Sequence, residues 1–161
     1  FYRTLLISPP RCGKTTLLRD LVRQVSDGTG RIRGRRVGLV DERSELAGVY
    51  RGVPQRDVGV RTDVLDACPK AQGIMLLLRS MSPEVVCADE IGRREDAEAL
   101  EEALNAGVGV LTTAHAGSME EVRERPHLRE LMAAKVFQRV VLLSRREGVG
   151  TVEWVKESEE I

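Results

Sequence analysis

A phosphate-binding loop is the first chemistry that this sequence suggests. The segment SPPRCGKTT, residues 8–16, matches the pattern G-x-x-x-x-G-K-[ST] except at its first position. In such a loop, backbone N–H groups surround the β-phosphate of a nucleotide, and the N-terminus of the following helix adds its positive dipole end. Lys14 could then reach the β- and γ-phosphates, while Thr15 could give its hydroxyl to Mg²⁺. The predicted nucleotide contacts are Pro10, Arg11, Cys12, Gly13, Lys14, Thr15 and Thr16.

Two residues of this loop depart from the usual pattern. Ser8 stands where the first glycine belongs, and Arg11 stands where glycine is also common. Serine costs little at the end of a strand unless the backbone there needs a positive φ. The side chain of Arg11 could point away from the nucleotide or approach a phosphate, and both possibilities stay open.

A pair of adjacent acids follows a second apolar run. In VVCADE, Asp89 and Glu90 stand at the end of a predicted strand, which is the arrangement of a Walker B motif. Asp89 would hold Mg²⁺ through water, and Glu90 would polarise the water that attacks the γ-phosphate. Taken alone, the two residues could be ordinary exposed acids, but a phosphate-binding loop earlier in the same chain favours the catalytic interpretation.

Two further segments carry candidate catalytic residues. Glu42 and Glu45, in VDERSEL, could orient the attacking water, although an ordinary charged turn explains them equally well. His115, in TTAHAGS, ends a predicted strand and could sense the γ-phosphate or stabilise charge, although a lone histidine is more often structural. His127 has no comparable support, and we expect it at the surface.

Several arginines are candidates for stabilising a transition state across a subunit interface, as in ATPases that work as rings. One sequence does not decide among them, and most are expected to be simply solvated. The candidates are Arg43, Arg51, Arg56, Arg61, Arg79, Arg93, Arg94 and Arg139.

Alternating strands and helices must position these residues. Apolar runs predict strands at 4–8, 36–41, 84–89 and 108–115, and a closing hairpin of 139–146 with 151–155. Apolar periodicity predicts helices from Lys14, from Pro69 and over 94–106, and Ser118 with Glu121 forms a capping box for a short helix. The helix after Pro69 is apolar nearly all round and is expected to be buried. The stretch 42–68 shows no convincing period.

This alternation predicts an α/β fold with a mostly parallel sheet, helices on both faces and a C-terminal antiparallel hairpin. Ligands of such sheets bind at the carboxyl ends of the strands. The candidate residues all follow strand ends, so we expect them to meet at one edge of the sheet.

The composition limits the class of protein. The chain of 161 residues fits one compact domain, and its 25 basic and 25 acidic residues balance, which argues against a dedicated nucleic-acid binder. No apolar run approaches the roughly 20 residues that span a bilayer. Three cysteines without a C-x-x-C spacing favour neither a disulfide framework nor a zinc site. A strand that begins almost at the first residue suggests a domain cut from a longer protein.

Three segments together resemble a known family. VDERSEL, LLLRSMSPEVVCADEIGRREDAEAL and LTTAHAGS are similar to the Asp box, Walker B region and His box of type II and type IV secretion ATPases. Within that superfamily, GKTTLLRDLVRQVS and the long segment from VDERSEL to SPEVV resemble the stage III sporulation protein AA family of endospore-forming bacteria. The resemblance extends over essentially the whole chain. The secretion ATPases often have Gly-Glu where this chain has Asp89-Glu90, which leaves the division of labour between these two acids open.

The resemblance implies a RecA-like P-loop ATPase domain over residues 1–161, with an additional N-terminal domain in the full protein. It implies ATP and Mg²⁺ as cofactors, with Glu42 and Glu45 as Asp-box acids, Asp89 and Glu90 as Walker B, and His115 as the His box. It also implies a hexameric ring that acts in the cytoplasm at the mother-cell membrane, on membrane-embedded channel components of the sporulation apparatus.

Two other functions remain possible on the sequence. A nucleotide-dependent scaffold would bind ATP or ADP with negligible turnover, which Glu90 argues against and Arg11 leaves open. A RecA-like ATPase could instead act on nucleic acid, as in plastid-type relatives, although the net charge of zero argues against this.

Overall fold

A seven-stranded sheet forms the centre of the protein in a computed structural model that describes residues 1–157, 159 and 160. Its strands are β1 (Thr4–Ser8), β4 (Val37–Asp41), β7 (Thr62–Asp66), β8 (Val85–Ala88), β9 (Gly109–His115), β10 (Arg139–Ser144) and β11 (Thr151–Glu157). The spatial order is β11-β10-β1-β9-β8-β4-β7. All neighbouring strands pair in parallel except β11, which runs antiparallel to β10. The predicted parallel sheet and closing hairpin are therefore confirmed.

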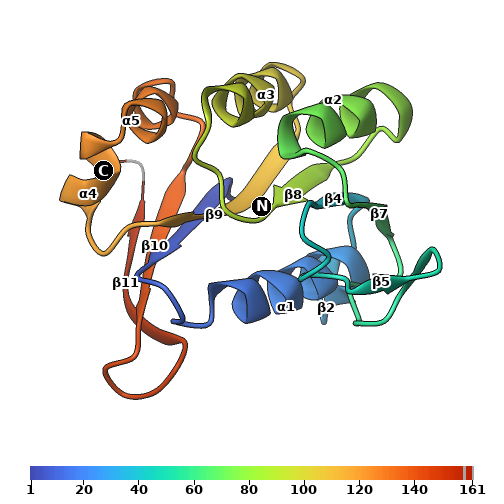
Figure 1. The fold of residues 1–161 in the computed structure, drawn as a ribbon, viewed down its shortest axis with the longest axis horizontal. Coiled ribbons are helices and arrows are strands. Elements are labelled where there is room, and N and C mark those ends of the chain that lie inside the picture. The colour runs from blue at the N-terminus through green and yellow to red at the C-terminus, as the bar shows by residue number, and fades with distance from the viewer. Residues whose placement is uncertain (158, 161) are drawn as a thin grey trace.

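Helices cover both faces of this sheet, as predicted. The helices are α1 (Lys14–Asp27), α2 (Lys70–Ser80), α3 (Arg94–Asn105), α4 (Met119–Glu124) and α5 (Pro126–Ala133). Figure 1 shows α1 alone on one side of the sheet and the other four helices on the opposite side. Two small hairpins complete the chain, β2 (Gly28–Thr29) with β3 (Ile32–Arg33) and β5 (Val49–Tyr50) with β6 (Val53–Pro54).

The apolar runs of the strands supply two separate cores. Successive side chains of a strand point to opposite faces, so a strand covered on both sides must be apolar throughout. In β1, Leu5 and Ile7 pack in the core beneath α2 to α5, whereas Leu6 packs in the core beneath α1. This two-sided burial explains why the strand segments show continuous apolar runs rather than alternation.

Two expectations about the middle of the chain were wrong. The stretch 42–68 is not irregular throughout, because it contains β5, β6 and the sheet strand β7. At the edge of the sheet, β7 has neighbours on one side only, so its sequence TDVLD needs no continuous apolar run. The helix α2 is also not buried all round: Gly73, Ile74 and Leu77 face the core, while Leu76 is 53% exposed.

The strand order brings the candidate residues together. β9 lies between β1 and β8, and the register pairs Ser8 of β1 with His115 and Ala88 of β8 with Thr112. Because these strands are parallel, their carboxyl ends lie at the same end of the sheet. The loop after β1, the acids after β8 and the histidine at the end of β9 therefore share this carboxyl-end edge. This is the edge at which ligands of α/β proteins bind.

Candidate active site

The loop between β1 and α1 presents backbone donors. Gly13 precedes α1 with a φ of 86°, in the left-handed region that favours glycine. Its lack of a side chain matters a second time, because a Cβ there would lie 2.9 Å from Val149 Cγ1 in the turn between β10 and β11. Within the described residues, no side chain caps the N-terminus of α1 and its first turn carries no acid. The first N–H groups of α1 are thus suited to an anion such as phosphate.

The structure places the two unusual loop residues differently. Ser8 is fully buried and does not need a positive φ, so serine is tolerated at this strand end. Arg11 is exposed and adopts a φ of 61°, a conformation that costs a residue other than glycine about 1–2 kcal/mol. The loop therefore keeps the backbone shape that a glycine would take more easily at this position.

Lys14 lies at the centre of the site with only 7% of its surface exposed. Its ammonium donates to the carbonyl oxygen of Ser8 at 3.1 Å, to Ser8 Oγ at 2.9 Å and to His115 Nδ1 at 3.0 Å. Burial lowers the pKa of Lys14, and the nearby Asp89, Cys12 and Glu90 oppose that shift. An ammonium has three hydrogens to donate, so all three are used and a phosphate oxygen would replace one of these acceptors.

The contact with Lys14 also fixes the tautomer of His115. An ammonium cannot accept a hydrogen bond, so His115 Nδ1 must be the acceptor and its proton must sit on Nε2. His115 Nε2 lies 3.3 Å from Glu90 Oε1 and can donate to it. A single imidazole therefore connects the lysine of the loop with the second acid after β8.

Asp89 is held by two hydroxyl groups. Thr15 Oγ1 donates to Asp89 Oδ2 at 3.0 Å, and Thr113 Oγ1 donates to the other carboxylate oxygen. Hydroxyl and carboxylate oxygens suit Mg²⁺, which is usually bound by one or two carboxylates together with substrate phosphates. Within residues 1–157, 159 and 160 there is no group of three or more His, Cys, Asp or Glu that could hold a metal ion. Thr15 and Asp89 supply one hydroxyl and one carboxylate, which are oxygen donors of the kind that Mg²⁺ prefers.

Glu90 adopts a left-handed backbone conformation, and two side chains contact its carboxylate. Its φ is 52°, a conformation that costs about 1–3 kcal/mol and is typical of functional sites. The N–H of Glu90 donates to Thr113 Oγ1 at 2.8 Å, which helps to hold this conformation. Its carboxylate lies 3.0 Å from Arg43 Nη1 and 3.3 Å from His115 Nε2, and it remains partly exposed. Glu90 is accordingly a fixed carboxylate that water can reach.

The acidic turn after β4 lies beside these residues. Asp41 is 2% exposed and accepts N–H bonds from Glu45, Leu46 and Ala47 at 3.0, 3.0 and 2.8 Å. This carboxylate therefore shapes the turn. A small cavity of about 20 Å³ joins the turn to the acids after β8, and it is lined by Asp41, Glu42, Arg43, Glu45, Lys70, Asp89 and Glu90.

The two predicted acids of this turn differ in their surroundings. Glu42 pairs with Lys70 at 2.5 Å, and this hydrogen bond holds the pKa of Glu42 below its usual value. Glu45 is exposed and lines the cavity beside Glu90. Both predicted acids thus lie near Glu90, but neither makes a hydrogen bond to it within the part of the chain that the structure describes.

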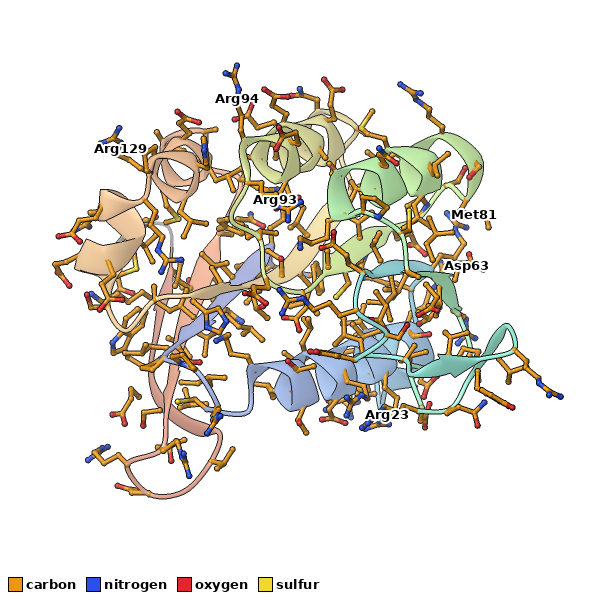
Figure 2. All side chains as sticks on the ribbon, in the orientation of Figure 1. Arg23, Asp63, Met81, Arg93, Arg94 and Arg129 are labelled. Atoms are coloured by element: carbon orange, nitrogen blue, oxygen red, sulfur yellow. The ribbon has the colours of Figure 1, made fainter. Side chains whose placement is uncertain are left out.

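The candidate arginines separate into several environments. Arg43 contacts Glu90 of its own chain. Arg61 donates to the carbonyl of Ser26, and Arg139 pairs with Glu157. Arg94 extends outward from the helical layer in Figure 2, where it pairs with Glu98.

Two contacts of the site were not anticipated from the sequence. Thr113 bonds to both Asp89 and Glu90, and Lys70 neutralises Glu42. The sequence does indicate that Thr113 makes a hydrogen bond, because a hydroxyl inside a buried strand needs a partner. Its partners depend on which strand lies beside β9, and the sequence does not state that.

Comparison with known proteins places the whole chain in one family. The family model described as "Sporulation stage III, protein AA" matches residues 1–160. The chain is 54% identical over 152 residues to "Stage III sporulation protein AA" of Bacillus subtilis (strain 168), covering 94% of this chain and 50% of that protein. It is 31% identical over 130 residues to "Uncharacterized protein ycf45" of Porphyra purpurea, covering 80% of this chain and 22% of that protein. The chain thus spans half or less of the length of these curated relatives.

Solved structures share the fold. The Legionella pneumophila ATPase DotB has a TM-score of 0.62 at 20% identity, covering 88% of this chain and 40% of that one. The VirB11 ATPase of the Brucella suis type IV secretion system has a TM-score of 0.65 at 20% identity, covering 98% and 49%. The pilus retraction motor PilT, solved with bound ADP, has a TM-score of 0.64 at 14% identity, covering 94% and 46%. At these identities the likeness shows the fold alone.

Proposed function

The chain belongs to the sporulation stage III protein AA family, and on that premise we propose that it binds and hydrolyses ATP with Mg²⁺. The observation that carries the proposal is the meeting of three groups at one sheet edge. Buried Lys14 follows β1, Asp89 contacts Thr15 of α1, and the partly exposed Glu90 lies beside both. A loop kept only for folding has no need of this acid pair.

Each residue has a defined role in this proposal. The first N–H groups of α1 and the Lys14 ammonium bind the phosphates, with further loop contacts from residues 10–16. Thr15 and Asp89 hold Mg²⁺, which when bound neutralises charge on the β- and γ-phosphates. Glu90 accepts a proton from the attacking water.

The remaining acids and His115 serve as positioning groups. His115 keeps Glu90 and Lys14 in a fixed relation through its two ring nitrogens. Glu42 and Glu45 line the cavity next to Glu90 and set the charge around the attacking water. We assign Glu42 the weaker influence, because Lys70 already neutralises it.

We further propose that ATP turnover energises assembly or operation of a secretion-like channel between mother cell and forespore. The family membership and the fold shared with the secretion ATPases DotB and VirB11 support this. In the proposal the full protein forms a hexameric ring in the cytoplasm and docks on membrane-embedded channel components. Across the described part of the chain, no helix is sufficiently long and apolar to span a membrane.

Steady-state ATPase activity tests the proposal. The protein containing this chain is compared with Lys14→Ala and Glu90→Gln at equal concentration, with and without Mg²⁺. Mg²⁺-dependent activity that both substitutions abolish is expected. Nucleotide binding with no turnover above the two variants would instead indicate a nucleotide-dependent scaffold. Strong stimulation by single-stranded nucleic acid would favour the alternative of an ATPase that acts on nucleic acid.

A further inference from the structure

Thr113 contacts both acids that follow β8. It lies in β9, is fully buried, and occupies the position after Thr112, which pairs with Ala88 of β8. Its hydroxyl donates to Asp89 Oδ1 and accepts the N–H of Glu90 at 2.8 Å. We propose that Thr113 is a positioning residue that sets the Mg²⁺ ligand and the general base together. This inference rests on the proposed function.

The first effect of Thr113 is on the rotation of the Asp89 carboxylate. One oxygen is held by Thr113, so the other, Oδ2, faces Thr15 Oγ1 at 3.0 Å. The carboxylate is therefore fixed between β9 on one side and the first turn of α1 on the other. Carboxylates that bind metals depend on such outer hydrogen bonds for their orientation.

The second effect is on the backbone of Glu90. Thr113 accepts two N–H bonds, that of Glu90 on its hydroxyl and that of Ile91 on its carbonyl oxygen at 2.9 Å. These bonds lie on both sides of the Glu90 Cα and support its φ of 52°. With this backbone, the Glu90 carboxylate reaches His115 and Arg43. Without the hydroxyl, the Glu90 N–H loses its partner and the strained conformation loses one of its supports.

The neighbouring Thr112 shows that a buried hydroxyl alone is not the distinguishing feature. Thr112 is also fully buried in β9, and its hydroxyl donates to the carbonyl oxygen of Ala88 at 2.6 Å. Its side chain therefore bonds to the backbone of β8 rather than to either acid. The two threonines are thus equally buried neighbours in β9, but only the hydroxyl of Thr113 bonds to Asp89 and Glu90.

The experiment compares Thr113→Val, Thr113→Ser and Thr112→Val with the unchanged protein. Each is assayed for kcat, KM for ATP, the Mg²⁺ concentration at half activation, and thermal stability. We expect Thr113→Val to lower kcat by about 10- to 100-fold and to raise the Mg²⁺ requirement, which is the usual scale for loss of a bond behind a metal ligand. KM for ATP should change little, because the phosphate contacts come from the loop.

Thr113→Ser keeps the hydroxyl and should retain most of the turnover. Thr112→Val should keep kcat and the Mg²⁺ requirement even if its melting temperature falls as far as that of Thr113→Val. The inference is overturned if Thr113→Val turns over within about twofold of Thr112→Val, or if Thr113→Ser is as slow as Thr113→Val. If the unchanged protein itself shows no turnover, the proposed hydrolysis fails and this inference falls with it.

Discussion

Removing the Asp41 carboxylate should destabilise the turn after β4 severely. Asp41→Ala deletes the acceptor of three backbone N–H groups, at 3.0, 3.0 and 2.8 Å. Two of the donors belong to Leu46 and Ala47, which are fully buried, so water does not readily replace the carboxylate. Hydrogen bonds to charged groups contribute about 1.5–3 kcal/mol each, but three bonds to one carboxylate are not additive. We expect a loss of about 3–5 kcal/mol in the free energy of unfolding.

This loss is a large fraction of the roughly 5–15 kcal/mol by which a domain is stable. For a domain of this size, 1 kcal/mol corresponds to about 2–4 °C, so the melting temperature should fall by roughly 6–20 °C. Asp41→Asn keeps one carbonyl oxygen, which can serve Leu46 and Ala47 while the bond to Glu45 is lost, and its effect should be intermediate.

Urea denaturation followed by circular dichroism measures the free energy of unfolding, and thermal denaturation followed by the same signal measures the melting temperature. Asp63→Ala is the matched control, because Asp63, which is labelled in Figure 2, is an exposed acid of β7. A surface substitution of this kind should change the free energy of unfolding by less than about 0.5 kcal/mol. If Asp41→Ala lies within about 1 kcal/mol of Asp63→Ala, the three bonds do not stabilise the turn as argued.

Three other predictions concern single side chains of the site. Lys70 holds the pKa of Glu42 below its usual 4.5, so the pair stabilises the fold above that pH and loses this contribution as pH falls through the lowered pKa. In Glu42→Gln, the urea concentration at the midpoint of unfolding should therefore fall less steeply as the pH is lowered than it does in the unchanged protein. An equally steep fall in the two proteins would contradict the pairing. Arg11→Gly should raise the free energy of unfolding by up to about 1 kcal/mol, because glycine adopts a positive φ at low cost; a decrease would contradict the strain. Nitrogen-15 NMR should show His115 protonated at Nε2 and not at Nδ1, with His127, the other histidine of the chain, as internal reference. The opposite tautomer would refute the contact with Lys14.

Features that depend on one contiguous segment of the chain could be predicted from the sequence. The strand, loop and helix around Lys14 follow from an apolar run, a glycine and a helical stripe that are contiguous in the chain. Asp89 and Glu90 follow an apolar strand in the same way. The alternation of strands and helices predicts a parallel sheet, in which the carboxyl ends of the strands lie at the same end. The proximity of Lys14, Asp89 and Glu90 could therefore be predicted as well.

Features that depend on the neighbouring strand could not be predicted. Thr113 bonds to the acids only because β9 lies beside β8 in one register. The strand β7 was missed because an edge position removes the need for a continuous apolar run. Likewise, the sequence gives no sign that Arg43 contacts Glu90 of its own chain or that Lys70 neutralises Glu42.

Single-turnover release of phosphate from Mg²⁺-ATP, with protein in excess, tests the central claim most directly. ATP affinity is first compared between the unchanged protein and Glu90→Gln, and we expect it to be similar, because the first N–H groups of α1 and the Lys14 ammonium bind the phosphates and Lys14 bonds to Ser8 and His115 rather than to Glu90. The unchanged protein should then release phosphate about 100-fold faster or more, which is the usual contribution of a general base. Equal release by the two proteins, or binding of ATP without release by the unchanged protein, would contradict the claim that Glu90 catalyses hydrolysis at this site.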